Sequence, residues 1–303
     1  MHICCTIGYD VWMINIRGNQ YSKRHTTLDS CTGCSKYWDF THHDSAVEDY
    51  ATTIDYILET TSYERLFFAG YSMGTTQYLI LLSERPEYNE KIKAGILLGP
   101  TAFGGHAKNP MIVASPYAEL IGTFLTKLGI YEFMPNFLEI KTWLAQSICK
   151  SSPMKLTMCR DFFALCLGME QNSMNASMAP LYMSHMPAGT NVKTMVHMGQ
   201  IFRNGDNFYK YDHGMVGNMK VYGSYKPHEY DLSKVLAPTA LIGGPVDGFS
   251  DPKDLDILAD KLPNLLYNKQ VAMKDFGHLH FLFAIETKSL VYDHVVHTFN
   301  QLR

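Results

Sequence analysis

The stretch that decides the fold is Arg65-Leu66-Phe67-Phe68-Ala69-Gly70-Tyr71-Ser72-Met73-Gly74-Thr75-Thr76-Gln77. An apolar run ends at Gly70, the pattern Gly-x-Ser-x-Gly follows, and a segment that suits a helix continues to Glu84. This order predicts a strand, a sharp turn and a helix, with Ser72 at the turn. Glycines at positions 70 and 74 let the strand and the helix approach closely. The bare pattern often arises by chance, so its place between a strand and a helix is what makes Ser72 a candidate nucleophile.

Strands and helices alternate outward from this turn. Apolar runs predict buried strands over 10–18, 92–100, 237–244 and 268–273, and helical spacing predicts helices over 45–60 (with Asp44 as N-cap), 251–261 and 279–302. Such alternation is typical of an α/β fold with a mostly parallel sheet.

The alternation stops between residues 111 and 230. This segment is helical in pattern, with one amphipathic face of Leu120, Ile121, Phe124, Leu125 and Leu128, and it holds 13 of the 17 methionines. We therefore expect a core formed by residues 1–110 and 231–303 and an inserted helical cap over 111–230. Methionine repacks easily, so a Met-rich cap suits long apolar ligands, although Met also simply fills irregular helical cores.

Composition limits the classes of function. The chain has 303 residues, 46% of them hydrophobic, which is enough for a large core. Its formal charge of −3 and scattered Lys and Arg residues argue against a nucleic-acid partner. No apolar run reaches the ~18 residues of a transmembrane helix, and the first residues do not have the pattern of a signal peptide. We expect no cofactor and no metal.

The seven cysteines point in more than one direction, because an odd number cannot all pair internally. Cys31 and Cys34 form a Cys-x-x-Cys pair that is compatible with zinc, but no second such pair or His pair lies nearby. The disulfide pairing of Cys4, Cys5, Cys31 and Cys34 stays open. For Cys149 and Cys159 we expect a disulfide rather than free thiols. Asn175-Ala176-Ser177 is an N-glycosylation sequon, a pattern that is frequent by chance.

Three candidate catalytic residues follow in the order Ser72, Asp247 and His278, each just after a predicted strand. This is the order of the α/β-hydrolase triad, in which the histidine activates the serine and the acid orients the histidine. Asp251 and Asp254 compete with Asp247, but they are better placed to begin or cap the next helix. His280 competes with His278.

With these residues in place, the chain resembles the acid lipase family, which includes lysosomal acid lipase and gastric lipase, and it is most similar to the insect members. The matching stretches cover nearly the whole chain: Gly8–Trp12, Arg17–Asn19, Tyr37–Phe40, Ile54–Leu58, Gly70–Gly74, Leu82–Tyr88, Pro187–Thr190, Asp247–Asp254 and Phe276–Phe281.

The resemblance implies an α/β-hydrolase fold with a helical cap or lid, and hydrolysis of neutral lipid esters such as triacylglycerols or sterol esters. It implies Ser72 as nucleophile, Asp247 as acid and His278 as base. It also implies a secreted or lysosomal protein, with a Cys149–Cys159 disulfide and a glycan at Asn175.

The sequence departs from the family pattern at the turn and upstream of it. Tyr71 and Met73 stand where the family has His and Gln, and His280 stands where it has Asp. The backbone amide of Met73 is one expected donor to the oxyanion, but the family's His-Gly-Leu turn, which gives the second, has no counterpart before Asp10. We therefore expect an N-terminally truncated lipase that lacks the first strands. A non-catalytic lipid-binding homologue or an inactive truncated form is the alternative function, and a thioesterase-like or peptidase-like hydrolase is a third.

Overall fold

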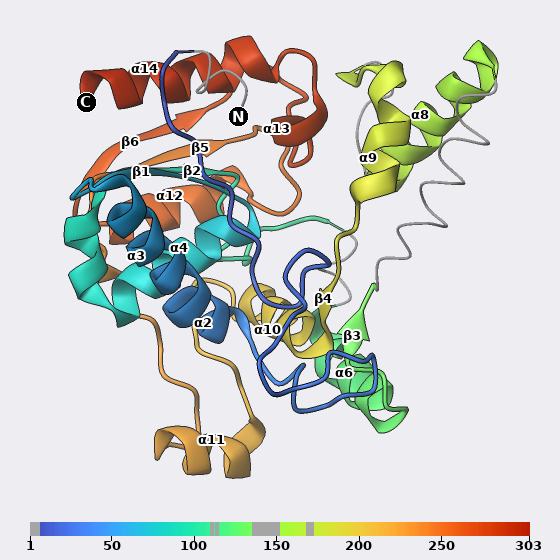
Figure 1. Ribbon diagram of the computed structural model, residues 1–303, viewed down its shortest axis with the longest axis vertical. Helices are drawn as coiled ribbons and strands as arrows, with labels where there is room; N and C mark the ends of the chain where they lie inside the picture. The colour runs from blue at the N-terminus through green and yellow to red at the C-terminus, as the bar shows by residue number, and fades with distance from the viewer. Residues whose placement is uncertain (1–6, 110–111, 113–114, 135–151, 168–172) are drawn as a thin grey trace.

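The computed structural model describes residues 7–109, 112, 115–134, 152–167 and 173–303. A four-stranded parallel sheet lies at its centre (Figure 1). The strands, in spatial order, are β1 (Leu66–Tyr71), β2 (Ile92–Leu98), β5 (Thr239–Gly243) and β6 (Leu265–Gln270). Because all four run in one direction, their carboxyl ends meet at the same edge. The predicted α/β fold with a parallel sheet is confirmed.

Helices cover both faces of this sheet (Figure 1). On one face lie α3 (Ala51–Thr61), α4 (Met73–Glu84) and α12 (Pro252–Lys261), and on the other lies α14 (Asp293–Gln301). Successive strand residues point to opposite faces. Leu97 accordingly packs in the core beside α4, whereas its neighbours Ile96 and Leu98 pack in the core beside α14. The sheet is thus buried on both sides, which explains why β2 and β5 are mostly apolar.

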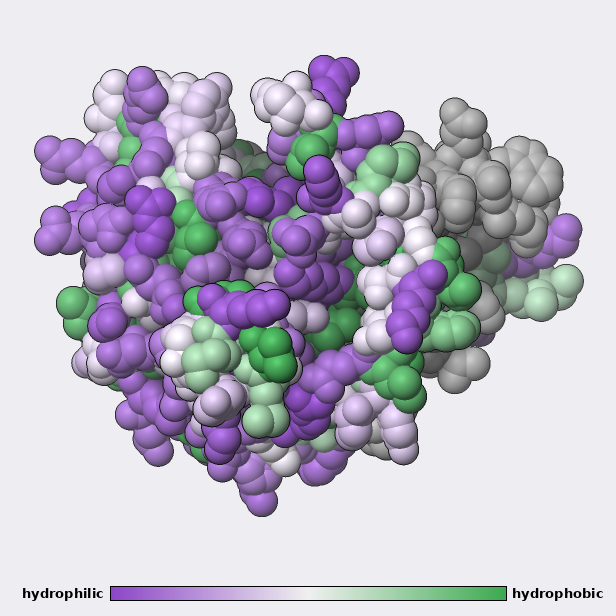
Figure 2. Space-filling view, turned by 90° about the horizontal axis from the view of Figure 1, so that it is seen from below, coloured by the Kyte–Doolittle hydropathy of each residue, from purple (hydrophilic) through white to green (hydrophobic). Residues whose placement is uncertain are grey.

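Most of the described chain between β2 and β5 is helical. Its elements are α6 (Ala118–Lys127), β3 (Glu132–Phe133), α8 (Pro153–Leu167), α9 (Ala179–His185), β4 (Thr190–Asn191), α10 (Val192–Arg203) and α11 (Gly214–Tyr222). α6 packs against α10, and α11 lies at the end of the molecule farthest from α14 (Figure 1). Of the apolar face expected here, only Leu125 is partly buried; Leu120, Ile121, Phe124 and Leu128 are exposed. On the face seen from this end, hydrophobic and hydrophilic side chains are mixed (Figure 2).

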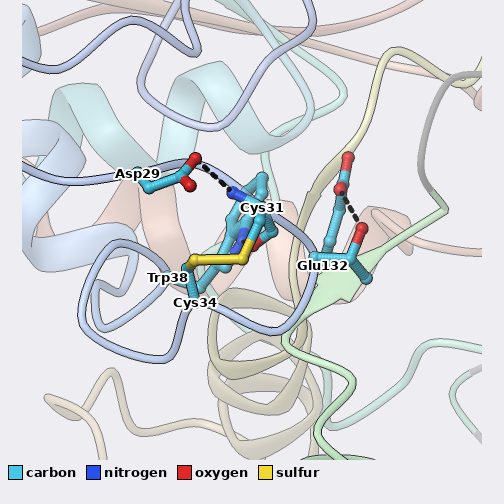
Figure 3. Close-up of a disulfide and its surroundings, with 6 residues drawn as sticks. Asp29, Cys31, Cys34, Trp38 and Glu132 are labelled. Atoms are coloured by element: carbon cyan, nitrogen blue, oxygen red, sulfur yellow. Dashed lines mark hydrogen bonds between the residues drawn. A yellow bond between two sulfur atoms is a disulfide. The ribbon is translucent and has the colours of Figure 1, made fainter.

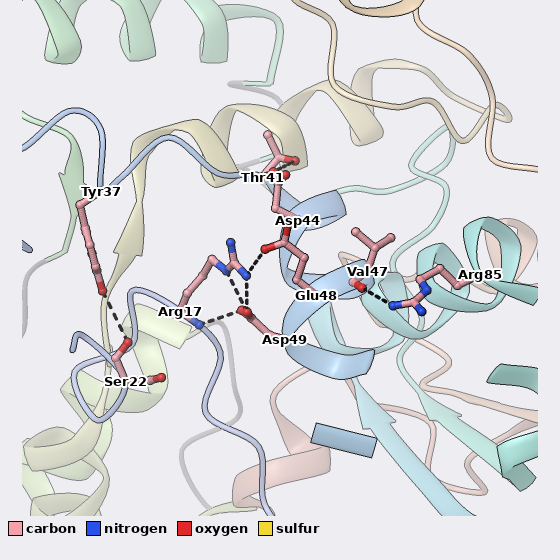
Figure 4. A network of polar contacts seen from close by, with 9 residues as sticks. All are labelled: Arg17, Ser22, Tyr37, Thr41, Asp44, Val47, Glu48, Asp49 and Arg85. Atoms are coloured by element: carbon pink, nitrogen blue, oxygen red, sulfur yellow. Dashed lines mark hydrogen bonds and ion pairs between the residues drawn. The ribbon is translucent and has the colours of Figure 1, made fainter. Parts of the chain in front are cut away.

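The N-terminal segment differs from the prediction. Residues 9–16, expected to begin a buried strand, form no regular secondary structure, and Met13 is exposed. Within the described residues, β1 pairs only with β2, so this segment has no strand to bond with. It is held instead at Arg17, whose backbone N–H donates to Asp49 Oδ2 (2.9 Å) and whose guanidinium pairs with Asp49 and Glu48 (Figure 4).

The first helix begins earlier than predicted. α2 (His42–Asp44) runs into a π-helix, η1 (Ser45–Tyr50), and then into α3. The N-cap is Thr41, and the expected cap, Asp44, is the other half of a capping box: its Oδ2 accepts from the Thr41 N–H at 2.7 Å (Figure 4). The prediction of Asp44 as N-cap was therefore wrong by three positions.

The C-terminal elements were predicted in the right order with shifted bounds. β6 begins at Leu265 rather than at Asn268, and the helix expected over 279–302 is interrupted. It consists of α13 (His280–Phe283), a π-helix, η8 (Lys288–Tyr292), and α14. Within the described residues, no helix combines the length and the apolar character needed to cross a membrane.

Candidate active site

Ser72 lies at a sharp turn between β1 and α4. Its backbone has φ 51° and ψ −121°, a region that residues with a side chain rarely adopt. Gly70 makes the turn possible, because a Cβ there would lie 2.7 Å from the Phe68 ring and 3.3 Å from the Gly74 carbonyl. The turn is also tied down: Ser72 N donates to Leu98 O (3.0 Å), and Thr75 N donates to Ser72 O (2.8 Å). This is the strained turn that the sequence predicts.

The structure brings His278 to Ser72 from the loop that follows β6. His278 Nε2 lies 2.6 Å from Ser72 Oγ, and His278 Nδ1 lies 2.8 Å from Asp247 Oδ2. His278 is 9% exposed. One histidine therefore connects the serine hydroxyl to a carboxylate, although Ser72 and His278 are separated by 206 positions in the sequence.

Asp247 is fixed in a loop just after β5. It is 2% exposed, and its Oδ1 accepts hydrogen bonds from the N–H groups of Phe249 and Ser250, both at 2.9 Å. A buried carboxylate needs such donors to offset its lost hydration. Because Oδ1 is occupied by the backbone, Oδ2 faces His278 Nδ1.

The competing acids and the competing histidine have other partners. Asp251 caps α12 by accepting from Lys253 N (3.0 Å), and Asp254 accepts from His106 Nδ1 (2.8 Å). His280 Nδ1 accepts from Gly277 N at 3.1 Å, and burial lowers the pKa of its imidazole. None of the hydrogen bonds formed by these three side chains within the described residues reaches Ser72.

Sequence reasoning missed Gly99, the residue that follows β2. Its φ is +52°, and a Cβ there would lie 3.1 Å from both Asp247 Oδ2 and His278 Nδ1. A side chain at this position would therefore press on the Asp247–His278 hydrogen bond. The signal in the sequence is Gly99 itself, since it lies at the carboxyl end of a predicted strand next to the strand that carries Ser72.

Two aromatic residues that flank His278 were also not predicted. The Tyr71 hydroxyl donates to the His278 carbonyl oxygen at 2.9 Å, and its ring centroid lies 5.0 Å from that of His278. Burial raises the pKa of Tyr71, so the hydroxyl keeps its proton and remains a donor. Phe249 lies 4.9 Å from the His278 ring by the same measure.

Cys31 and Cys34 are joined by a disulfide, and Trp38 Nε1 donates to the Cys31 carbonyl oxygen at 2.8 Å (Figure 3). Their sulfurs are thus not thiolates, the form that binds zinc. Cys159 is also disulfide-bonded. Its expected partner, Cys149, lies outside the described residues.

The sequon residue Asn175 is exposed, and its Oδ1 accepts from Ser177 N (3.0 Å).

Another group of side chains has the donor types of a metal site. The ligand atoms of His106, Asp206 and Asp254 lie within 4.8 Å of one another. His106 is already bonded to Asp254 through both its ring and its backbone N–H. This hydrogen bonding accounts for the close approach of His106 and Asp254.

The arrangement of Ser72, His278 and Asp247 has the geometry for nucleophilic catalysis. A neutral imidazole whose Nδ1–H is bound by a carboxylate presents a basic Nε2 to the serine hydroxyl. Met73, the first residue of α4, has a backbone N–H without a partner inside the helix, as every first-turn residue does. Such an N–H next to the nucleophile is the usual place for one oxyanion donor.

Comparison with known proteins agrees with this architecture. Residues 4–127 match the alpha/beta hydrolase fold family. The chain is 35% identical to Lipase 3 of Drosophila melanogaster, covering 95% of this chain and 73% of that protein. It is 32% identical to the lysosomal acid lipase/cholesteryl ester hydrolase of Rattus norvegicus and 33% identical to the gastric triacylglycerol lipase of Mus musculus, each over 97% of this chain and 72% of the relative.

Fold and family match together define an α/β hydrolase. The sequence identity of 32–35% to these lipases over nearly the whole chain shows that the chain belongs to the acid lipase family. It is a lipase-like carboxylic ester hydrolase.

Proposed function

We propose that Ser72, His278 and Asp247 form the catalytic triad of this hydrolase, and that its substrates are esters of neutral lipids, either triacylglycerols or sterol esters. One observation carries the proposal: a continuous chain of hydrogen bonds runs from Ser72 Oγ through both nitrogens of His278 to the buried Asp247. The substrate class is taken from the relatives, which are named as a triacylglycerol lipase and a cholesteryl ester hydrolase.

In the proposed reaction, His278 Nε2 accepts the Ser72 hydroxyl proton while Oγ attacks the ester carbonyl carbon. Negative charge then develops on the carbonyl oxygen, and the Met73 N–H donates to it. His278 passes the proton to the leaving alcohol, and an acyl-serine remains. Water, deprotonated by His278, attacks the acyl-serine, which releases the carboxylic acid and restores Ser72. Throughout, Asp247 orients His278 and stabilises its imidazolium form.

The domain division is part of this proposal. Residues 1–110 and 231–303 supply the sheet and the triad, and residues 111–230 form a cap over the site. A secreted or lysosomal protein is consistent with the family. A glycan on the exposed Asn175 and a disulfide between Cys149 and Cys159 fit that location, because both modifications arise in the secretory pathway.

The test is hydrolysis of a triacylglycerol emulsion and of soluble esters by the purified chain and three variants. We expect Ser72→Ala to lower kcat by about 10⁴-fold or more, and Asp247→Asn by about 10⁴-fold, because the imidazole is then held in the wrong tautomer. Ser289→Ala, an exposed serine on η8, is the matched control and should retain full activity.

Two results would contradict the proposal. In the first, Ser72→Ala retains the turnover of the wild type, which would require a different nucleophile. In the second, the folded wild type binds lipid and hydrolyses no ester, which is the behaviour of a non-catalytic homologue.

A further inference from the structure

An apolar pocket of about 160 Å³ lies between α6 and α10. Its walls come from the facing sides of the two helices and from the loop after Asp247; they include Ala118, Leu125, Val192, Met195, Phe202 and Phe249. Ser115 is the one hydroxyl-bearing residue among those that line it. Such a pocket favours hydrocarbon and offers little to a polar ligand.

The two helices that form the walls are held at a fixed, short separation. A Cβ at Gly122 would lie 2.4 Å from Val196 Cγ2, and one at Gly199 would lie 2.5 Å from the Cβ of Ala118. Beside this glycine contact, Glu119 of α6 accepts from Arg203 of α10 at 2.6 and 2.7 Å. The pocket is thus pre-formed, and its size is set by the side chains that line it.

Phe249 connects this pocket to the proposed triad. Its ring lines the pocket 6.2 Å from the ring of Phe202, and 4.9 Å from the ring of His278. Its backbone N–H donates to Asp247, so the carboxylate that binds His278 also fixes the backbone at Phe249. Phe249 therefore lies both in the wall of the pocket and against His278, the residue that is hydrogen-bonded to Ser72.

We infer that this pocket binds the end of the acyl chain, and that it makes the hydrolase selective for esters of medium-length acids; the inference rests on the proposed function of Ser72. A cavity of about 150 Å³ lined by aliphatic and aromatic residues holds one benzene, which has six carbons. The pocket at about 160 Å³ therefore accepts about six terminal carbons of the chain. Longer chains leave carbons outside it, and shorter ones leave it partly empty.

Met195 is a lining residue whose size should affect this length. It lies near the beginning of α10, lines the pocket and is half-buried, so its side chain can be changed without opening the core. Replacement by alanine lengthens the pocket, and replacement by tryptophan fills it. Met215 of α11 is the matched control, because it is 67% exposed and is not among the lining residues.

The experiment measures kcat/KM for p-nitrophenyl esters from acetyl to palmitoyl. In the wild type, kcat/KM should rise by up to about four-fold for each added methylene until the pocket is full, and then level off or fall. Met195→Ala should move the optimum to longer acids and Met195→Trp to shorter ones, with Met215→Ala unchanged. An unaltered chain-length profile in both Met195 variants overturns the inference while leaving the proposed function intact.

A second measurement does not depend on turnover. Octanoate binding to the Ser72→Ala chain, followed by isothermal titration calorimetry, should be weakened at least ten-fold by adding Met195→Trp and should not change on adding Met215→Ala. Equal binding in all three chains overturns the inference even if no ester is hydrolysed, and absence of hydrolysis with Met195-sensitive binding overturns the proposed function alone.

Discussion

Gly99 is the single residue whose replacement tests the triad geometry most finely. It is not one of the three proposed catalytic residues. The space in front of its Cα is nevertheless bounded by Asp247 Oδ2 and by His278 Nδ1 and Cε1, which would lie 3.1–3.2 Å from a Cβ at this position. A methyl group would push His278 and Asp247 apart. The expected effect is on catalysis rather than on folding.

We expect Gly99→Ala to lower kcat/KM by about 10²-fold, since a displacement of catalytic groups by about an ångström costs that much. The control is Gly205→Ala. Gly205 has a similar backbone, with φ +63°, but nothing lies within 4 Å of its added Cβ. It should show the same backbone strain and normal activity. Equal activity losses in the two variants would assign the effect to strain and contradict the account.

At the scale of single residues, the sequence indicated the three candidate catalytic residues but not the residues that pack around them. The order of Ser72, Asp247 and His278, each after a strand, was enough to choose them over nearby competitors, and the structure places them within hydrogen-bond distance. Gly99 and Phe249 could not be chosen, because their importance comes from contacts with residues far away in the sequence. No periodicity or local motif records such contacts.

At the scale of elements, the beginning of α10 joins the inserted helices to the N-terminal loop. Asn191 is fully buried; its Oδ1 accepts from Thr194 N (3.1 Å) as the N-cap, and its Nδ2 donates to the carbonyl oxygens of Trp38 and Phe40, both at 2.6 Å. One side chain thus satisfies backbone groups in two separate segments. α10 also forms one wall of the acyl pocket inferred above.

We expect Asn191→Ala to lower the free energy of unfolding by about 3 kcal/mol, since it removes a helix cap and two hydrogen bonds to the buried carbonyls of Trp38 and Phe40. Urea denaturation measures the change. Asp231→Ala is the control: this exposed aspartate caps the short helix Leu232–Lys234 by accepting from Ser233 N, and its loss should cost under about 1 kcal/mol. Similar losses in both variants would show that the two carbonyl contacts contribute little.

Sequence periodicity predicted the central strands, but it did not predict the structure of the N-terminal segment or the break in the last helix. β1, β2 and β5 are apolar runs that end in glycine or at the Ser72 turn, so their bounds could be predicted closely. The strand expected from Asp10 is absent because a strand needs a neighbour, which an apolar run does not guarantee. The last helix is broken near Ala284, where no proline or glycine gives warning.

At the scale of the whole molecule, a pair of buried histidines lies where the core meets the inserted helices. His42 of α2 and His197 of α10 are both 0% exposed, with ring centroids 5.4 Å apart. Neither ring nitrogen of His42 has a hydrogen-bond partner among the residues that the structure describes. Burial lowers the pKa of His42 to about 4, and burial together with the nearby His42 lowers that of His197.

This pair makes the fold sensitive to acid. The unfolded chain binds a proton on His42 near pH 6.5, whereas the folded chain resists protonation down to about pH 4. Above pH 6.5, His42 is neutral in both states and does not oppose folding. As the pH falls from 6.5 towards 4, only the unfolded chain gains this proton, so the free energy of unfolding decreases. For a fully buried group with this shift, the loss is on the order of 3 kcal/mol.

We expect the free energy of unfolding, measured with urea at a series of pH values, to fall between pH 6.5 and 4, and His42→Phe to fall less steeply, because phenylalanine does not titrate. His25→Phe, which changes an exposed histidine, should keep the wild-type slope. Identical slopes in the wild type and His42→Phe would mean that other groups cause the acid sensitivity.

The central claim is that Ser72 is the nucleophile, and covalent labelling tests it most directly. The folded chain would be treated with a fluorophosphonate, digested, and mapped by mass spectrometry. We expect one phosphonate adduct, on the peptide that contains Ser72, strongly reduced in Asp247→Asn and absent in Ser72→Ala. An adduct on another residue, or a folded wild-type chain that never labels, would contradict it.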